Sequence, residues 1–179
     1  MNEYTVPTER VELPAVLNNV AANLEWRASE RSATIEQDIA PGLLSLTGDS
    51  SELTQLFQNL VDNAIKYGHE GGTVRIRAWH DTSPAKGEAS GVTQAGDIMV
   101  SIADEGEGIA REHLPRLTER FYRVDTARSR ELGGTGLGLA IVKHIASRHR
   151  ARLTIDFEAG KGSTFTLRFP RASGSSQKT

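Results

Sequence analysis

The stretch DSSELTQLFQNLVDNAIKY, residues 49–67, carries the pattern of one amphipathic helix with a polar site on it. Asp49 followed by Glu52 three positions later matches a capping box, in which side chains satisfy the free N–H groups of a helix start. We therefore predict a helix from Asp49 to about Lys66. Leu53, Phe57, Leu60 and Ala64 fall on one face of it, and Gln55, Asn59, Asn63 and Lys66 fall on the opposite face.

The residue types on the polar face favour a binding site. A face exposed only to solvent is usually built from Glu and Lys, whereas Asn59 and Asn63 lower helix propensity without an evident gain. An Asn side-chain oxygen is a neutral, hard ligand that suits Mg²⁺, an ion that is often shared with substrate phosphates. A solvated face is the simpler alternative, but the asparagine pair favours function.

A second candidate site follows a predicted strand, at Asp104-Glu105-Gly106-Glu107-Gly108-Ile109. The two glycines allow the backbone to turn sharply and to face a flat ligand. A carboxylate only accepts hydrogen bonds, so Asp104 can accept from the exocyclic amine of adenine and reject the carbonyl that guanine carries there. The alternative is an ordinary turn with a capping Asp.

A third candidate is the glycine run Gly133-Gly134-Thr135-Gly136-Leu137-Gly138, which precedes an apolar helix predicted over Gly136 to Arg148. Glycines let the backbone approach a ligand closely, and a helix N-terminus attracts anions. Glycines that serve tight packing would give the same pattern. The apolar residues around much of this helix predict that it is deeply buried.

Periodicity and turn residues predict the remaining elements. We expect a helix over Leu13 to Arg31 and a hairpin formed by Thr34 to Ile39 and Leu43 to Thr47 across Pro41-Gly42. A flexible connector is expected over residues 81–96, and a disordered tail over residues 171–179. The other expected strands are Thr8 to Val11, Val74 to His80, Ile98 to Ala103, Arg152 to Phe157 and Ser163 to Phe169, the last two forming a closing hairpin.

Composition limits the class of protein. The 179 residues carry a net charge of −2, which gives no general attraction to nucleic acid or to anionic membranes. The chain has no cysteine, which excludes disulfides and thiolate metal sites. No segment approaches the roughly 18 apolar residues of a membrane span. We expect one soluble cytoplasmic domain with no nucleic-acid partner.

Four motifs in order resemble the N, G1, F and G2 boxes of sensor histidine kinases. They are Asn59 to Tyr67, Asp104 to Ile109, Arg120-Phe121-Tyr122-Arg123 and Gly134 to Leu139. The resemblance implies the catalytic ATP-binding domain of the GHKL superfamily over residues 1–170. It implies an α+β fold, the Bergerat two-layer α/β sandwich, with a mixed, mostly antiparallel sheet covered on one face by helices. Residues 114–130 are similar to the lid of the phosphate-regulon sensor kinases.

The resemblance also implies roles for individual residues, with ATP and Mg²⁺ as the bound groups. Asn63 would bind Mg²⁺, Asn59 would order the phosphates, and Lys66 with Tyr67 would contact them. Asp104 would hold adenine, supported by Thr164, and Gly106, Gly108 and Ile109 would line the base site. An ATP lid over about 109–135 would supply Arg123 to the γ-phosphate. Lid and phosphate contacts would come from Phe121, Tyr122, Arg123, Gly134, Thr135, Gly136, Leu137 and Gly138.

A histidine kinase also needs a phosphoacceptor histidine on a dimerising helical hairpin, and none of the five histidines has that sequence context. We therefore expect an isolated, monomeric catalytic domain of a membrane-bound kinase. It would donate the γ-phosphoryl group to a histidine of a separate domain and serve a response regulator indirectly. Asn59 stands where water-cleaving relatives carry a Glu, and an amide cannot act as a general base, so weak hydrolysis is expected.

Two other functions remain open at this stage. One is a nucleotide-dependent switch that closes on ATP without efficient transfer. The other is a serine kinase that inhibits a sigma factor, which the lid sequence disfavours. The spacing in Gly160-Lys161-Gly162-Ser163 does not fit a P-loop, and the glycines elsewhere do not make a dinucleotide fingerprint.

Overall fold

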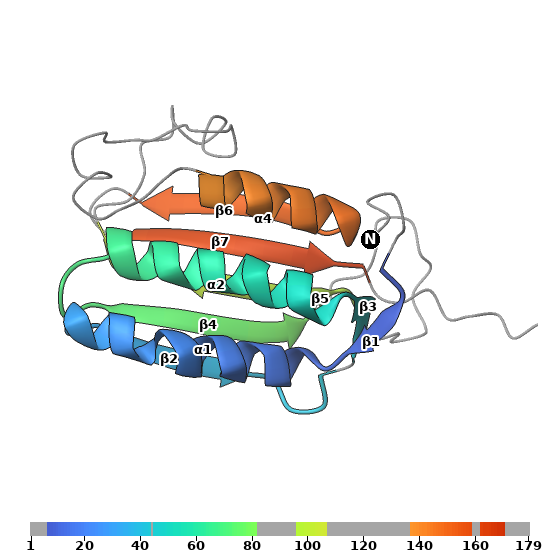
Figure 1. Ribbon diagram of the computed structural model, residues 1–179, viewed down its shortest axis with the longest axis horizontal. Helices are drawn as coiled ribbons and strands as arrows, with labels where there is room; N and C mark the ends of the chain where they lie inside the picture. The colour runs from blue at the N-terminus through green and yellow to red at the C-terminus, as the bar shows by residue number, and fades with distance from the viewer. Residues whose placement is uncertain (1–6, 44, 82–95, 107–136, 159–161, 171–179) are drawn as a thin grey trace, which may run out of the picture.

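The computed structural model describes residues 7–43, 45–81, 96–106, 137–158 and 162–170, and it shows a two-layer sandwich (Figure 1). Three helices lie side by side over one face of a five-stranded sheet, with the second helix between the other two. This is the predicted α/β sandwich. Its elements are β1 (Glu9–Val11), α1 (Leu13–Glu30), β2 (Thr34–Ile39), β3 (Leu46–Gly48), α2 (Ser50–Tyr67), β4 (Thr73–His80), β5 (Ile98–Ala103), α4 (Leu137–Arg148), β6 (Arg152–Glu158) and β7 (Gly162–Phe169).

The large sheet has the strand order β2-β4-β5-β7-β6 and is mostly antiparallel. The predicted β4–β5 and β6–β7 pairs are confirmed. The predicted hairpin between the second and third strands is wrong, because β2 pairs in parallel with β4 and β3 pairs with β1 in a separate two-stranded sheet. The parallel pair needs a crossover, which α2 supplies. The turn at Pro41-Gly42 therefore carries the chain from one sheet to the other.

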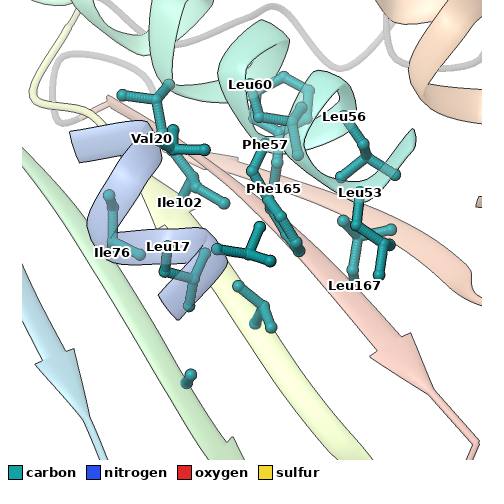
Figure 2. Close-up of a cluster of buried hydrophobic side chains, with 14 of the residues drawn as sticks. Leu17, Val20, Leu53, Leu56, Phe57, Leu60, Ile76, Ile102, Phe165 and Leu167 are labelled. Carbon is teal, nitrogen blue, oxygen red and sulfur yellow. The ribbon is translucent and has the colours of Figure 1, made fainter. Parts of the chain in front are cut away.

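The core lies between the helices and the sheet (Figure 2). Alternate residues of the central strands, such as Ile76, Ile102 and Leu167, are fully buried against α1 and α2. This alternation is the expected pattern for a sheet with one covered face. Phe57 of α2 and Phe169 of β7 have ring centroids 6.2 Å apart at an interplanar angle of 56°, within the range of favourable aromatic pairs.

Helix α2 begins as predicted, with the Asp49 carboxylate accepting a hydrogen bond of 2.9 Å from the Glu52 N–H. The Glu52 carboxylate accepts from Arg148 of α4, with 2.6 Å between Nε and Oε1. The buried ring of His149 accepts at Nε2 from the Asp49 N–H at 3.0 Å, and its Nδ1 lies 2.8 Å from the Ile145 carbonyl oxygen. The C-terminal end of α4 is thus fixed to the first turn of α2, and His149 has a structural role there.

Helix α4 is less buried than its composition predicted. Val142, Ile145 and Ala146 are buried, and Leu139 and Ile141 are partly buried. Lys143, His144 and Ser147 are exposed. The difference arises because α4 lies at the edge of the helical layer, with α2 on one side. In the described ranges, no helix has the length and apolar character needed to cross a membrane.

The directions of the elements bring the candidate residues to one end of the sandwich. Helices α1 and α2 and strand β5 end there, while β7 and α4 begin there (Figure 1). We call this the nucleotide end. The small β1–β3 sheet lies at the opposite end.

Candidate nucleotide site

Asp104 directly follows β5 and is held by the start of β7. Its N–H donates to the Ser163 carbonyl oxygen at 2.9 Å, and the Ser163 N–H donates back to Asp104 Oδ1 at 3.3 Å. The buried residues Ile98, Val100 and Ile102 face the helices, so alternation places Asp104 on that face too. The carboxylate is therefore directed toward the helical layer by the backbone of both strands.

The support predicted from Thr164 comes from its neighbour Ser163. Thr164 is the register partner of Ala103, so its side chain lies on the face of the sheet away from the helices. Ser163 is one position earlier, is buried, and lies on the same face as Asp104. The backbone contact to Asp104 thus comes from the residue before the predicted Thr164, and one residue in a strand changes the face.

Burial raises the pKa of Asp104 to about 6, while the hydrogen bond from Ser163 and the charge of nearby His69 lower the pKa and so limit the rise. At neutral pH the group is still mainly a carboxylate that only accepts hydrogen bonds. A buried acceptor with few partners suits the exocyclic amine of an adenine base. This environment agrees with the role that the resemblance implies for Asp104.

The end of α2 packs directly on the turn after Asp104. The His69 N–H donates to the Glu105 carbonyl oxygen at 2.7 Å, and Gly68 forms an isolated bridge with Gly106. A Cβ on Gly106 would lie 2.7 Å from the Tyr67 carbonyl oxygen and 3.0 Å from Asp104 Oδ1. Gly106 is therefore required for close contact between the two segments, rather than for a left-handed backbone.

Gly162 closes the same site from β7. Its φ is +131°, a conformation that L side chains rarely adopt, and an added Cβ would lie only 2.0 Å from the Asp104 carbonyl oxygen. A side chain at this position would push β7 away from Asp104. Gly162 is not among the site residues predicted from the sequence.

Asn59 and Asn63 are half-buried on α2, one helical turn apart. Among the described residues, Asn59 Nδ2 is a buried donor without a hydrogen-bond partner. Such atoms are rare because each costs about 1–3 kcal/mol of desolvation. A phosphate oxygen would satisfy the Asn59 donor, and the Asn63 amide oxygen is a ligand type that Mg²⁺ accepts. The residues present therefore fit Mg-ATP.

Lys66 is engaged within the protein. Its Nζ lies 3.1 Å from Asp62 Oδ2, and Asp62 Oδ1 lies 2.7 Å from an Nη of Arg27 on α1. Directly after α1, the Arg31 guanidinium donates to the carbonyl oxygen of Gly68, the residue that follows α2, at 2.9 Å. Arg27 of α1 and the C-cap residue Arg31 thus contact the last turns of α2 and its C-cap, beside the candidate site.

The N-terminus of α4, at Leu137 and Gly138, lies at the nucleotide end. The partial positive charge of a helix N-terminus favours phosphate groups there. The other predicted contacts from the glycine run and the lid, and two from the base site, lie outside the described residues. They are Gly108, Ile109, Phe121, Tyr122, Arg123, Gly134, Thr135 and Gly136.

Comparison with known proteins identifies the family. Residues 48–173 match the family described as histidine kinase-, DNA gyrase B-, and HSP90-like ATPase. The chain belongs to this family of ATPases. This confirms the resemblance that the four motifs indicated.

Sensor proteins and sensor histidine kinases are among the proteins similar to this chain. The chain is 44% identical over 170 residues to the phosphate regulon sensor protein PhoR of Pseudomonas aeruginosa, covering 95% of this chain and 35% of PhoR. The chain thus spans about a third of that relative's length. Its structure is similar to that of the mycobacterial sensor histidine kinase MprB, with a TM-score of 0.73 and 28% identity, covering 91% of this chain and 97% of that one. It is equally similar to full-length ShkA in complex with AMPPNP, with a TM-score of 0.73 and 28% identity over 95% of this chain and 33% of ShkA.

Proposed function

We propose that this chain is the catalytic domain of a sensor histidine kinase and binds Mg-ATP at the nucleotide end. The observation that carries the proposal is the placement of Asp104, fixed by the backbone of Ser163, beside the C-terminal end of α2, the helix that carries Asn59 and Asn63. Family membership and the names of the relatives support the same function. The AMPPNP bound to ShkA is a nucleotide analogue of the kind proposed here.

Each residue has a chemical task in this proposal. Asp104 accepts the hydrogen bond of the adenine amine, and the Asn59 amide donates to a phosphate oxygen. Asn63 would hold Mg²⁺, which would supply positive charge to balance the phosphates. Lys66, Tyr67 and the lid residue Arg123 complete the phosphate contacts.

The proposed reaction is transfer to a nitrogen atom of histidine. The bond between the γ-phosphorus and the bridging oxygen breaks, a bond from phosphorus to an imidazole nitrogen forms, and ADP leaves with the bridging oxygen. The imidazole proton passes to a base on the acceptor domain, because the Asn59 amide cannot accept it. The acceptor hairpin belongs to the parent kinase, and a response regulator then receives the phosphoryl group.

The proposal also includes the oligomeric state and the location of the domain that were expected from the sequence. The chain acts as a monomer on the cytoplasmic side of a membrane-bound kinase. The relationship to a phosphate-regulon sensor protein supports this setting.

Incubation with γ-labelled ATP, Mg²⁺ and the purified acceptor hairpin of a PhoR relative tests the function. We expect an acid-labile label on the hairpin histidine, and its loss in Asn63→Ala. Asn23→Ala, at an exposed position of α1, is the matched control and should keep full labelling. Tight Mg-ATP binding without any label would contradict transfer and support the nucleotide-dependent switch. Absence of Mg-ATP binding would contradict both.

A further inference from the structure

Asp62 shares its carboxylate between two cations from different helices. Oδ1 lies 2.7 Å from Nη1 of Arg27 on α1, and Oδ2 lies 3.1 Å from Nζ of Lys66, one turn later on α2. The Arg27, Asp62 and Lys66 side chains are 35%, 22% and 17% exposed, so the group is largely shielded from solvent. We call these three residues the α1–α2 triad.

The α1–α2 triad contains two positive groups and one carboxylate. One cation is enough to pair a partly buried carboxylate, and the triad supplies two. Arg27 is the better permanent partner because its guanidinium is always charged and has a fixed geometry. The Arg27 guanidinium also lies over the Trp26 ring, 5.2 Å from its centroid, which helps to hold its orientation. Lys66 can therefore leave Asp62 without leaving a buried charge unpaired.

The position of Asp62 connects the triad to the candidate site. Asp62 directly precedes Asn63 and lies three positions after Asn59 on α2, so all three occupy neighbouring surface of the helix. Lys66 lies one turn beyond Asp62 and three positions beyond Asn63. A short movement of its long side chain is enough to exchange the Asp62 carboxylate for a phosphate placed near Asn63.

We propose that Asp62 is a positioning residue that competes with the triphosphate for Lys66, and that Arg27 of α1 weakens this competition. When nucleotide binds, Lys66 Nζ exchanges Asp62 Oδ2 for a phosphate oxygen, and Arg27 remains as the partner of Asp62. This inference rests on the proposed function, because it takes Lys66 as a phosphate ligand. It assigns α1, which lies outside the four motifs, an influence on phosphate affinity.

The competition predicts opposite effects for two variants. Asp62→Asn releases Lys66 and should tighten Mg-ATP binding about fivefold, the size expected for one partly exposed ion pair. Arg27→Met leaves Lys66 as the main partner of Asp62 and should weaken Mg-ATP binding by a similar factor. Because Arg27 acts through Asp62, the double variant should bind like Asp62→Asn alone. Adenosine has no phosphate, so its affinity should stay the same in all three.

Isothermal titration calorimetry with Mg-ATP and with adenosine tests this inference. Arg75→Met is the matched control, since it breaks the exposed 3.3 Å pair with Glu36 on the face of the sheet away from the helices and should change neither affinity. Weaker Mg-ATP binding by Asp62→Asn, an additive loss in the double variant, or equal losses for adenosine and Mg-ATP would each overturn the inference. These results would leave the proposed function intact if the wild-type chain binds Mg-ATP and Asn63→Ala does not. Absence of wild-type binding would overturn both.

Discussion

Arg148 on α4 and Glu52 on α2 form a two-point ion pair, with 2.6 Å between Nε and Oε1 and 3.3 Å between Nη2 and Oε2. Both side chains are largely shielded, with exposed fractions of 19% and 22%. The pair joins segments that are 96 positions apart in the chain. It fixes the end of α4 that lies away from the nucleotide end, next to the buried His149.

Arg148→Met should therefore destabilise the fold. Removing one partner leaves a poorly solvated Glu52 carboxylate, and we expect a loss of about 1–2 kcal/mol in the free energy of unfolding. Urea denaturation followed by circular dichroism measures it. Lys143→Met, at an exposed position of the same helix, is the control and should have little effect. Equal unfolding midpoints for both variants would show that the pair does not stabilise α4.

Adenosine binding should depend on pH through Asp104. The pKa of about 6 means that the acceptor is protonated as the pH falls through this value, so affinity should decrease by about tenfold per pH unit well below it. Calorimetry between pH 5 and pH 8 measures the effect. Asp104→Asn should bind weakly at every pH, without this dependence. A pH-independent wild-type affinity would contradict an ionised Asp104 as the base acceptor.

Asp104 should also make the free energy of unfolding depend on pH, and in the opposite direction to the adenosine affinity. Because the folded-state pKa lies above the ordinary value of 3.8, the folded chain binds more protons than the unfolded chain between these two values. The contribution of Asp104 to stability is therefore fully present below about pH 4 and is lost as the pH rises through about 6. Asp104→Asn should unfold at a higher denaturant concentration than wild type at pH 8 in the absence of nucleotide. A lower midpoint would contradict the dominance of burial.

Gly162→Ala should damage both the fold and the site. The new Cβ would lie 2.0 Å from the Asp104 carbonyl oxygen, in addition to the strain of a φ of +131°. Gly42→Ala is a useful control, because Gly42 has a φ of +72° but open space around its Cβ, so it should cost only about 1–2 kcal/mol. Thermal unfolding and adenosine binding measure the difference. Similar behaviour of the two variants would show that β7 can move away from Asp104 at little cost.

Asn59→Leu should separate stability from function. It removes a buried donor that has no partner among the described residues, so the nucleotide-free chain should become more stable by about 1 kcal/mol. Mg-ATP affinity should fall, because a phosphate oxygen loses its donor. Denaturation without nucleotide, together with calorimetry, tests both parts. A destabilised variant with unchanged Mg-ATP affinity would contradict a ligand-binding role for Asn59.

Local sequence patterns predicted helix boundaries and the pairing of strands that are close in the sequence. The start of α2 follows from Asp49 and Glu52, and the closing hairpin follows from two alternating strands around a glycine turn. The pairing of β2 did not follow, because its partner β4 lies beyond α2 and the turn at Pro41-Gly42 looks the same in either topology. Strand partners depend on packing between distant segments, which local periodicity does not record.

The residues of the candidate site could likewise be predicted only in part from local sequence patterns. The motifs predicted Asp104, Asn59, Asn63 and Gly106 as site residues, because their chemical types stand out at element ends or on a helix face. Ser163 was passed over in favour of Thr164, although the alternation of Phe165, Leu167 and Phe169 in β7 places Ser163 on the buried face and Thr164 on the other. Arg27 was missed because a single arginine on an amphipathic helix has no local signal, and its partner Asp62 is 35 positions away.

The nucleotide end is built from segments that are far apart in the sequence, and this links nucleotide binding to folding. The backbone of Asp104 is paired with that of Ser163, 59 positions later, and the turn after Asp104 pairs with Gly68. No partly assembled sheet contains this arrangement, so nucleotide should bind only to chains in which β7 is in register. By mass action, a nucleotide concentration 100 times the dissociation constant would add about 2.7 kcal/mol to the stability of the complete chain, and nothing to a misregistered one. ATP would then favour correctly folded molecules only after β7, the last strand of the chain, has joined the sheet.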